Sequence, residues 1–74
     1  MKYQVFENDI ACSEIAKSLR DPAWQKDTFD NFADAVEFAE QWLGFYGLGH
    51  EKYYPNQKIN YYPEDGCTIE VREI

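Results

Sequence analysis

The sequence predicts an α+β fold, with one main amphipathic helix over about residues 31–43 packed on a small, mainly antiparallel sheet. Three observations predict this fold: a capped helical pattern in the middle of the chain, an alternating apolar stretch at residues 1–7, and two alternating stretches at 58–62 and 67–71. A helix on one face of a three- or four-stranded sheet is the simplest arrangement that buries these apolar stripes together.

Length and composition predict one folded domain, residues 1–74. Hydrophobic residues make up 45% of the chain and aromatic residues 18%, which is too much for a disordered acidic tail. A chain this short buries only about 60% of the surface that its unfolded form exposes, so its core is small. We therefore expect an aspartate in place of Val36 or Ile69 to unfold the domain.

The first strand is predicted over residues 1–7, because Tyr3 and Val5 alternate with Gln4 and Phe6. The segment that follows has two interpretations. A short helix over residues 10–19 is predicted by five apolar residues that fall on one side at helical spacing, namely Ala11, Cys12, Ile15, Ala16 and Leu19, with Ser13 among the residues of the other side.

The alternative to this short helix is a hairpin, in which Asn8-Asp9 forms a two-residue turn and residues 10–15 form a second strand. Either element ends at Asp21-Pro22, because the residue before a proline is pushed out of the helical region. Residues 24–29 are then expected to run extended toward the main helix.

The main helix is predicted to begin after Asn31 and to run to Leu43. Asn31 is a suitable N-cap, Asp34 stands three residues later in the capping-box position, and Gly44 closes the helix. One face of the helix is apolar and consists of Phe32, Ala35, Val36, Ala39 and Leu43. Residues 44–56, rich in glycine and tyrosine, are expected to form a loop before the final hairpin, in which Gly66 supplies the left-handed turn position.

Charge excludes several classes of function. Seven basic residues stand against fourteen acidic ones, for a net charge of −7. Direct binding to nucleic acid or to an anionic membrane needs a basic patch and is therefore not expected. The sequence has no apolar run long enough to cross a bilayer and no signal peptide at residues 1–4, so we expect a soluble cytoplasmic protein.

No catalytic, metal-binding or cofactor-binding motif is found. Cys12 and Cys67 form no Cys-x-x-Cys pair and are expected to be free thiols that pack as small hydrophobic groups. His50 is the only histidine and lacks the second histidine of a zinc-protease helix. The glycines of residues 44–49 follow a helix, so a bound phosphate would meet no helix N-terminus. A small enzyme around His50, paired with one of the cysteines, is the least favoured alternative.

Acidic residues accumulate in the middle of the chain. No lysine or arginine occurs between Lys26 and Lys52, and that interval holds six carboxylates, namely Asp27, Asp30, Asp34, Glu37, Glu40 and Glu51. Glu37 and Glu40 lie toward the helix C-terminus, where the helix dipole disfavours negative charge. Solubility alone would explain an acidic surface. However, this pattern opposes helix stability in the direction expected of a surface that meets a basic partner.

Aromatic residues outnumber what one small core can hide. Tyrosine offers rigid contact area and a hydroxyl group, which is why interfaces favour it, although these rings could also merely cover a thin sheet. The predicted contact residues for a basic protein partner are Asp30, Asp34, Glu37, Glu40, Gln41, Phe38, Trp42, Tyr46, Tyr53 and Tyr54. A second hypothesis is a homo-oligomeric structural or adaptor protein that self-associates through the same aromatic residues.

In general layout the chain resembles small phage-encoded inhibitors of the anti-CRISPR kind. The resemblance lies in its size, its acidity, the capped helix start at residues 29–35 and the lack of a catalytic motif. It implies an inhibitor that occludes the basic nucleic-acid-binding surface of a bacterial CRISPR effector complex. The resemblance carries over no residue by position; the spacing of the charges selects the four acids to test against such a partner, namely Asp30, Asp34, Glu37 and Glu40.

Overall fold

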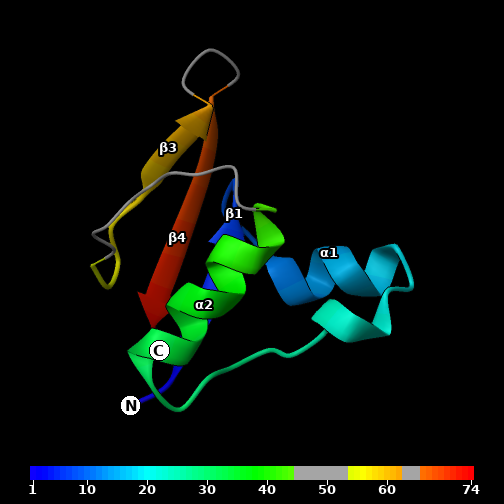
Figure 1. Cartoon of the computed structure of the whole chain (residues 1–74), viewed down its shortest axis with the longest axis horizontal. Coiled ribbons are helices and arrows are strands. Elements are labelled where there is room, and N and C mark those ends of the chain that lie inside the picture. Colours follow the sequence, from blue (N-terminus) through cyan, green and yellow to red (C-terminus); the bar gives the residue numbers. More distant parts are fainter. Residues whose placement is uncertain (45–53, 63–65) are drawn as a thin grey trace.

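Two strands from opposite ends of the sequence form the centre of the sheet. In the computed structural model, which describes residues 1–44, 54–62 and 66–74, β1 (Tyr3–Glu7) pairs antiparallel with β4 (Cys67–Glu73). Val5 lies opposite Val71. Because side chains alternate along a strand, these two residues and Ile69 share one face, where all three are almost fully buried. The two chain termini consequently lie at the same end of the sheet (Figure 1).

The segment after β1 combines both predicted alternatives. Asn8 and Asp9 have φ values of 51° and 67°, as a two-residue hairpin turn requires, and they connect β1 to the two-residue strand β2 (Ile10–Ala11). The helix α1 (Cys12–Ser18) follows directly. The predicted helix is therefore confirmed but begins two residues later, because the first two residues belong to the sheet.

Two residues, one in α1 and one at its C-cap, differ in burial from what the helical pattern predicted. Leu19 was expected on the buried side but is 72% exposed, although as the C-cap it keeps helical geometry and its N–H donates a hydrogen bond of 3.0 Å to the Ile15 carbonyl. Ser13 was expected on the polar side and is buried. This difference follows from the short length of α1, over which spacing alone defines a face poorly.

The segment that joins α1 to the main helix is only partly extended. The 3-10 helix η1 (Pro22–Trp24) has Asp21 as its N-cap, and the Asp21 carboxylate accepts a hydrogen bond of 3.1 Å from the Ala23 N–H. The expectation of an extended run from Trp24 is therefore wrong at its start, because this cap and the proline favour a helical turn there. Phe29, at the end of the run, forms a β-bridge with Tyr3 through hydrogen bonds of 2.8 and 2.9 Å.

The main helix, α2 (Phe32–Trp42), agrees closely with its prediction. The Asn31 side chain accepts a hydrogen bond of 2.8 Å from the Asp34 N–H and donates one of 2.9 Å to the Asp34 carboxylate. Leu43 forms the C-cap, and Gly44 follows with a φ of 65°. Ala35, Ala39 and Leu43 are buried against β1 and β4.

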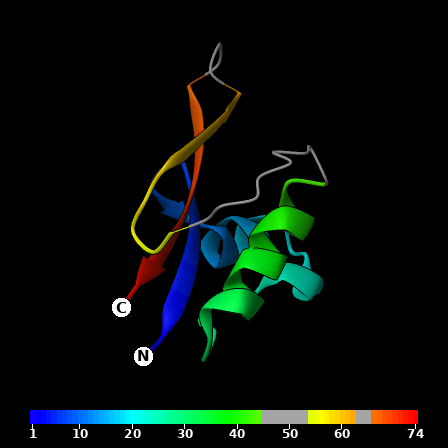
Figure 2. The same ribbon diagram turned by 60° about the vertical axis from the view of Figure 1, so that its left-hand side comes forward.

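The sheet has four antiparallel strands in the order β2-β1-β4-β3, which confirms the predicted α+β class. The edge strand β3 (Ile59–Tyr62) forms a hairpin with β4, and Gly66 has a φ of 68° in its turn. Helices α1, η1 and α2 all lie on one side of the sheet (Figure 2). Among the residues described, no helix covers the other side, and no helix of that part of the chain is long and apolar enough to cross a membrane.

Candidate protein-binding face

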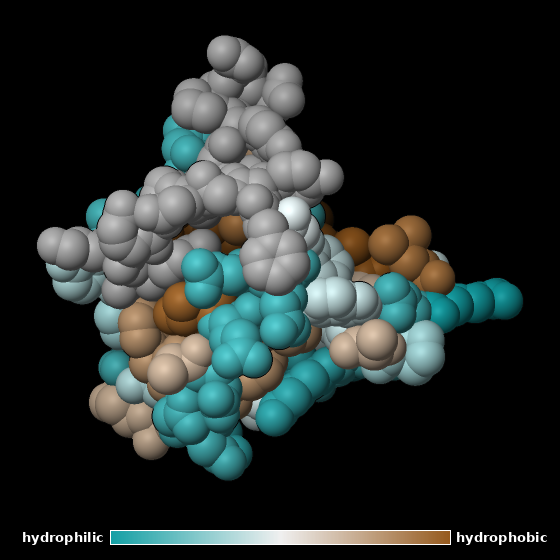
Figure 3. All heavy atoms as spheres, in the orientation of Figure 1, coloured by the Kyte–Doolittle hydropathy of each residue, from teal (hydrophilic) through white to brown (hydrophobic). Residues whose placement is uncertain are grey.

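The outward face of α2 carries the acidic residues predicted to contact a partner. Asp34, Glu37, Glu40 and Gln41 are all exposed, and hydrophilic side chains gather over this helix on the visible face of the molecule (Figure 3). The carboxylates of Asp34 and Glu37 accept hydrogen bonds from the neutral side-chain amides of Asn31 and Gln41, respectively. No ion pair joins Asp34, Glu37 or Glu40 to a lysine or arginine of residues 1–44, 54–62 and 66–74. We call these three residues the α2 acidic face.

Most of the described cations pair with acids elsewhere in the molecule. The ion pairs have N···O distances between 2.8 and 3.6 Å and join Lys2 to Asp30, Lys17 to Glu14 and Asp27, Lys58 to Asp9, and Arg72 to Asp9 and Glu70. Three acids that make no such pair therefore lie together on α2.

Asp30 differs from the other predicted acidic contacts because it has an internal cation. Its carboxylate accepts a hydrogen bond of 2.9 Å from the Lys2 ammonium. This hydrogen bond and the charge of Lys2 hold the pKa of the Asp30 carboxyl below its usual value. A role for Asp30 in binding stays a prediction, but a partner would have to compete with Lys2 for it.

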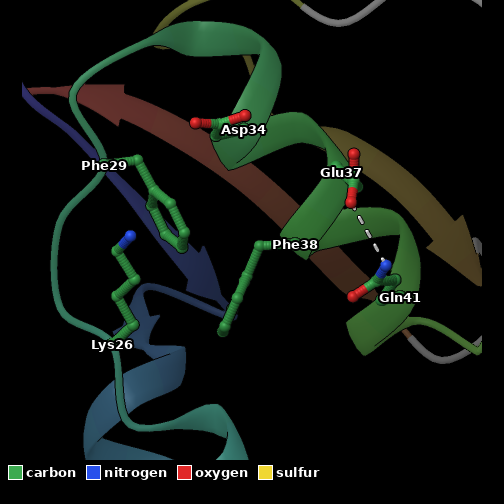
Figure 4. Close-up of a pocket in the computed structure, with 6 residues that line it drawn as sticks. All are labelled: Lys26, Phe29, Asp34, Glu37, Phe38 and Gln41. Carbon is green, nitrogen blue, oxygen red and sulfur yellow. Dashed lines mark hydrogen bonds between the residues drawn. The ribbon is translucent and has the colours of Figure 1, made fainter.

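A shallow groove of about 220 Å³ runs along one flank of α2. Its lining includes four of the predicted contact residues from α2, namely Asp34, Glu37, Phe38 and Gln41. The opposite wall is formed by Lys26 and Phe29, which sequence reasoning did not select (Figure 4). Glu40 does not line this groove and lies elsewhere on the exposed part of the helix.

An aromatic cluster supports this flank of α2. Phe38 lies 5.1 Å from Phe29, 5.4 Å from Trp24 and 6.1 Å from Trp42, measured between ring centroids. Trp24 also contacts Trp42 at 5.8 Å. Phe38 and Trp42 thus already have ring partners within the chain, which reduces the area they offer to self-association. That second hypothesis stays untested.

Of the three predicted tyrosine contacts, the structure describes one. Tyr54 is 54% exposed and precedes β3. Tyr46, Tyr53 and His50 lie outside the described residues.

The buried Cys12 is not activated as a nucleophile. Both cysteines are free thiols, Cys12 buried and Cys67 half-buried. Burial, together with the charge of Glu7, raises the pKa of Cys12 to about 12, so this thiol stays protonated near neutral pH. Within the described part of the chain, no group of three or more histidine, cysteine, aspartate and glutamate side chains is placed to hold a metal ion.

The sheet surface opposite the helices carries an ion-pair network centred on Arg72. Its guanidinium lies 3.9 Å from the centroid of the Phe6 ring and bonds Glu70 at 2.8 Å and Asp9 at 2.9 Å. Lys58 also pairs with Asp9, at 2.8 Å. The hydrogen bond from Lys58, followed by the charges of Lys58 and Arg72, holds the pKa of the Asp9 carboxyl below its usual value.

This network predicts how stability depends on pH. Because the folded-state pKa of Asp9 is lowered, its ionised form stabilises the fold above the unfolded-state value of about 3.9, and that contribution is lost as the pH falls through the folded-state pKa. Asp9→Asn keeps a residue that tolerates positive φ but removes the charge. We expect a lower melting temperature than wild type at pH 7 and a smaller further loss in acid, measured by circular dichroism. Glu40→Gln is the control, and an Asp9→Asn curve parallel to that of the wild type would contradict the prediction.

Comparison of the chain with protein-family models, with curated proteins and with solved structures gave no match. The function must therefore be argued from the surface alone.

Proposed function

We propose that this protein is a small acidic protein-binding module that inhibits a nucleic-acid-binding partner by occupying the partner's basic surface. The observation that supports the proposal is the separation of charges. Lys2, Lys17, Lys58 and Arg72 are paired away from α2, whereas the α2 acidic face makes no ion pair with a described cation and only Lys26 lines the groove beside it. A cation from another molecule can therefore bind there without displacing an internal ion pair.

The scaffold adds specificity to this charge. The α2 acidic face lies on a helix of 11 residues that is capped at both ends and packed on the sheet, so its carboxylates keep a fixed spacing. A fixed pattern of negative charge can match the spacing of lysine and arginine residues that normally contact phosphates. The overall charge of −7 also accelerates encounter with a basic partner and repels competing nucleic acid.

The proposed action is occlusion, with no chemical step and no cofactor. A CRISPR effector complex holds nucleic acid in a positively charged channel and is one partner of the required chemistry. With such a partner, the protein would be phage-encoded and would act in the cytoplasm of the host cell.

The proposal predicts a salt-sensitive partner that competes with nucleic acid. The tagged chain is used to capture proteins from a nuclease-treated lysate of its native host, and the column is eluted with increasing salt. We expect a nucleic-acid-binding protein to elute as the Debye length shortens from about 10 Å at 0.1 M toward about 3 Å at 1 M salt. Added nucleic acid should release the same protein at low salt.

Two comparisons make this capture experiment decisive. An unrelated acidic protein of equal net charge, fixed to the same column, should not retain the partner. A captured partner that high salt and nucleic acid both fail to release would contradict occlusion. A salt-insensitive dimer of the chain itself, seen by size-exclusion chromatography, would instead support the oligomeric hypothesis.

A further inference from the structure

We infer that the groove beside α2 is a subsite for an arginine side chain of the protein partner. The inference rests on the proposed function, because it names the group that the acidic surface would receive. The groove combines two kinds of lining that an arginine needs. The rings of Phe29 and Phe38 lie next to each other on one side, while Asp34, Glu37 and Gln41 present oxygen atoms along α2 (Figure 4).

The negative side of the groove is available to a ligand. Asp34 and Glu37 are exposed and belong to the α2 acidic face, which makes no ion pair with the described cations. The side-chain N–H of Gln41 donates a hydrogen bond of 3.4 Å to Glu37 (Figure 4). The side-chain carbonyl oxygen of Gln41 can therefore accept a hydrogen bond from a ligand. A guanidinium has five N–H donors and no acceptor, which matches a wall made of carboxylate and amide oxygens.

The aromatic side already holds a cation from the chain itself. The Lys26 ammonium lies 4.9 Å from the centroid of the Phe29 ring, within the range of a cation–π contact. Lys26 makes no ion pair within 4 Å of a described carboxylate, and beyond the ring contact its charge acts on Asp30, where it helps to lower the pKa of that carboxyl. Phe29 is only 6% exposed, so an arriving arginine reaches its ring by displacing Lys26, whose exposed and flexible side chain then moves into solvent.

Arginine fits this groove better than lysine does. Its planar guanidinium stacks on a ring while its edge donates two parallel hydrogen bonds to a carboxylate, and it loses less hydration than an ammonium. A lysine ammonium can approach the ring and a carboxylate, but it can neither stack flat on the ring nor donate two parallel hydrogen bonds. The groove therefore selects for arginine, whereas the rest of the α2 acidic face responds to positive charge of either kind.

The test uses a short arginine-glycine peptide and the same peptide with lysine in place of arginine, each titrated into the full chain. Backbone amide signals of Glu37 and Phe38 and the indole signals of Trp24 and Trp42, followed by nuclear magnetic resonance, report on the groove. We expect the arginine peptide to shift these signals with an affinity about fivefold higher than that of the lysine peptide, which corresponds to about 1 kcal/mol.

Two matched pairs of variants locate the effect. Glu37→Gln should weaken arginine-peptide binding about fivefold, and Glu40→Gln, on the same helix but outside the groove, should weaken it less than about twofold. Lys26→Met should tighten binding of the arginine peptide. Arg20→Gln removes an equal charge from a residue outside the groove lining and should tighten it less.

The outcomes separate the subsite from the proposed function. Equal affinity for the two peptides, with equal effects of Glu37→Gln and Glu40→Gln, would overturn the arginine subsite and leave the general acidic surface in place. Failure of both peptides to bind at low salt would contradict the subsite and the proposed function together.

Discussion

Replacing Ile69 by aspartate is expected to unfold the protein. Ile69 lies in the middle of β4, is 0% exposed, and is paired with Glu7 on one side and Ile59 on the other. Truncating a buried isoleucine to alanine already costs about 2–5 kcal/mol, and an unpaired buried carboxylate adds a further desolvation penalty. A chain of this length has a total stability of only about 4–11 kcal/mol, so the aspartate removes most or all of it.

The matched comparison for Ile69 is Val36, at which an aspartate was expected from the sequence to be equally disruptive. The structure changes that expectation, because Val36 is only half-buried at the edge of the core, where a carboxylate can reach water. We expect Ile69→Asp to lose the cooperative thermal transition in circular dichroism, and Val36→Asp to keep it at a lower temperature. A folded Ile69→Asp variant would contradict the assignment of Ile69 to the centre of the core.

The main helix could be predicted from the sequence because its determinants are local. Asn31 and Asp34 are three residues apart, and the cap they form depends on no other part of the chain. The start of the short helix α1 was harder to predict, because Ile10 and Ala11 fit a strand and a helix equally well. Their pairing with β1 decided between the two, and that pairing depends on the turn at Asn8 and Asp9.

The candidate site was only half predictable, for a similar reason. The side chains of α2 that line the groove follow from helical spacing, so Asp34, Glu37 and Gln41 were identified correctly as sharing the exposed surface. The opposite wall depends on the path of the segment before the helix, which the Phe29 bridge to Tyr3 fixes. The neutralisation of Asp30 likewise depends on Lys2, which is 28 residues away in sequence, and no local pattern indicates that contact.

Reversing two charges on α2 should weaken partner binding strongly without harming the fold. Glu37→Lys combined with Glu40→Lys changes exposed positions that contribute nothing to the core. Lysine is a good helix former, and a cation is favoured near the C-terminal end of a helix, so the melting temperature should stay the same or rise slightly. Each reversal replaces one attraction with one repulsion. Two reversals should therefore weaken binding by about 3 kcal/mol, or roughly a hundredfold.

A matched double variant shows whether binding depends on the position of the charges on α2 or on the net charge of the protein. Glu14→Lys with Glu73→Lys changes the net charge by the same amount at two exposed residues outside α2. We expect it to slow association but to keep most of the affinity, because distant charges act mainly through long-range attraction. Affinity for the captured partner can be measured by calorimetry at several salt concentrations. Equal losses for the two double variants would show that only net charge matters, and unchanged binding of Glu37→Lys with Glu40→Lys would exclude the α2 acidic face as the contact surface.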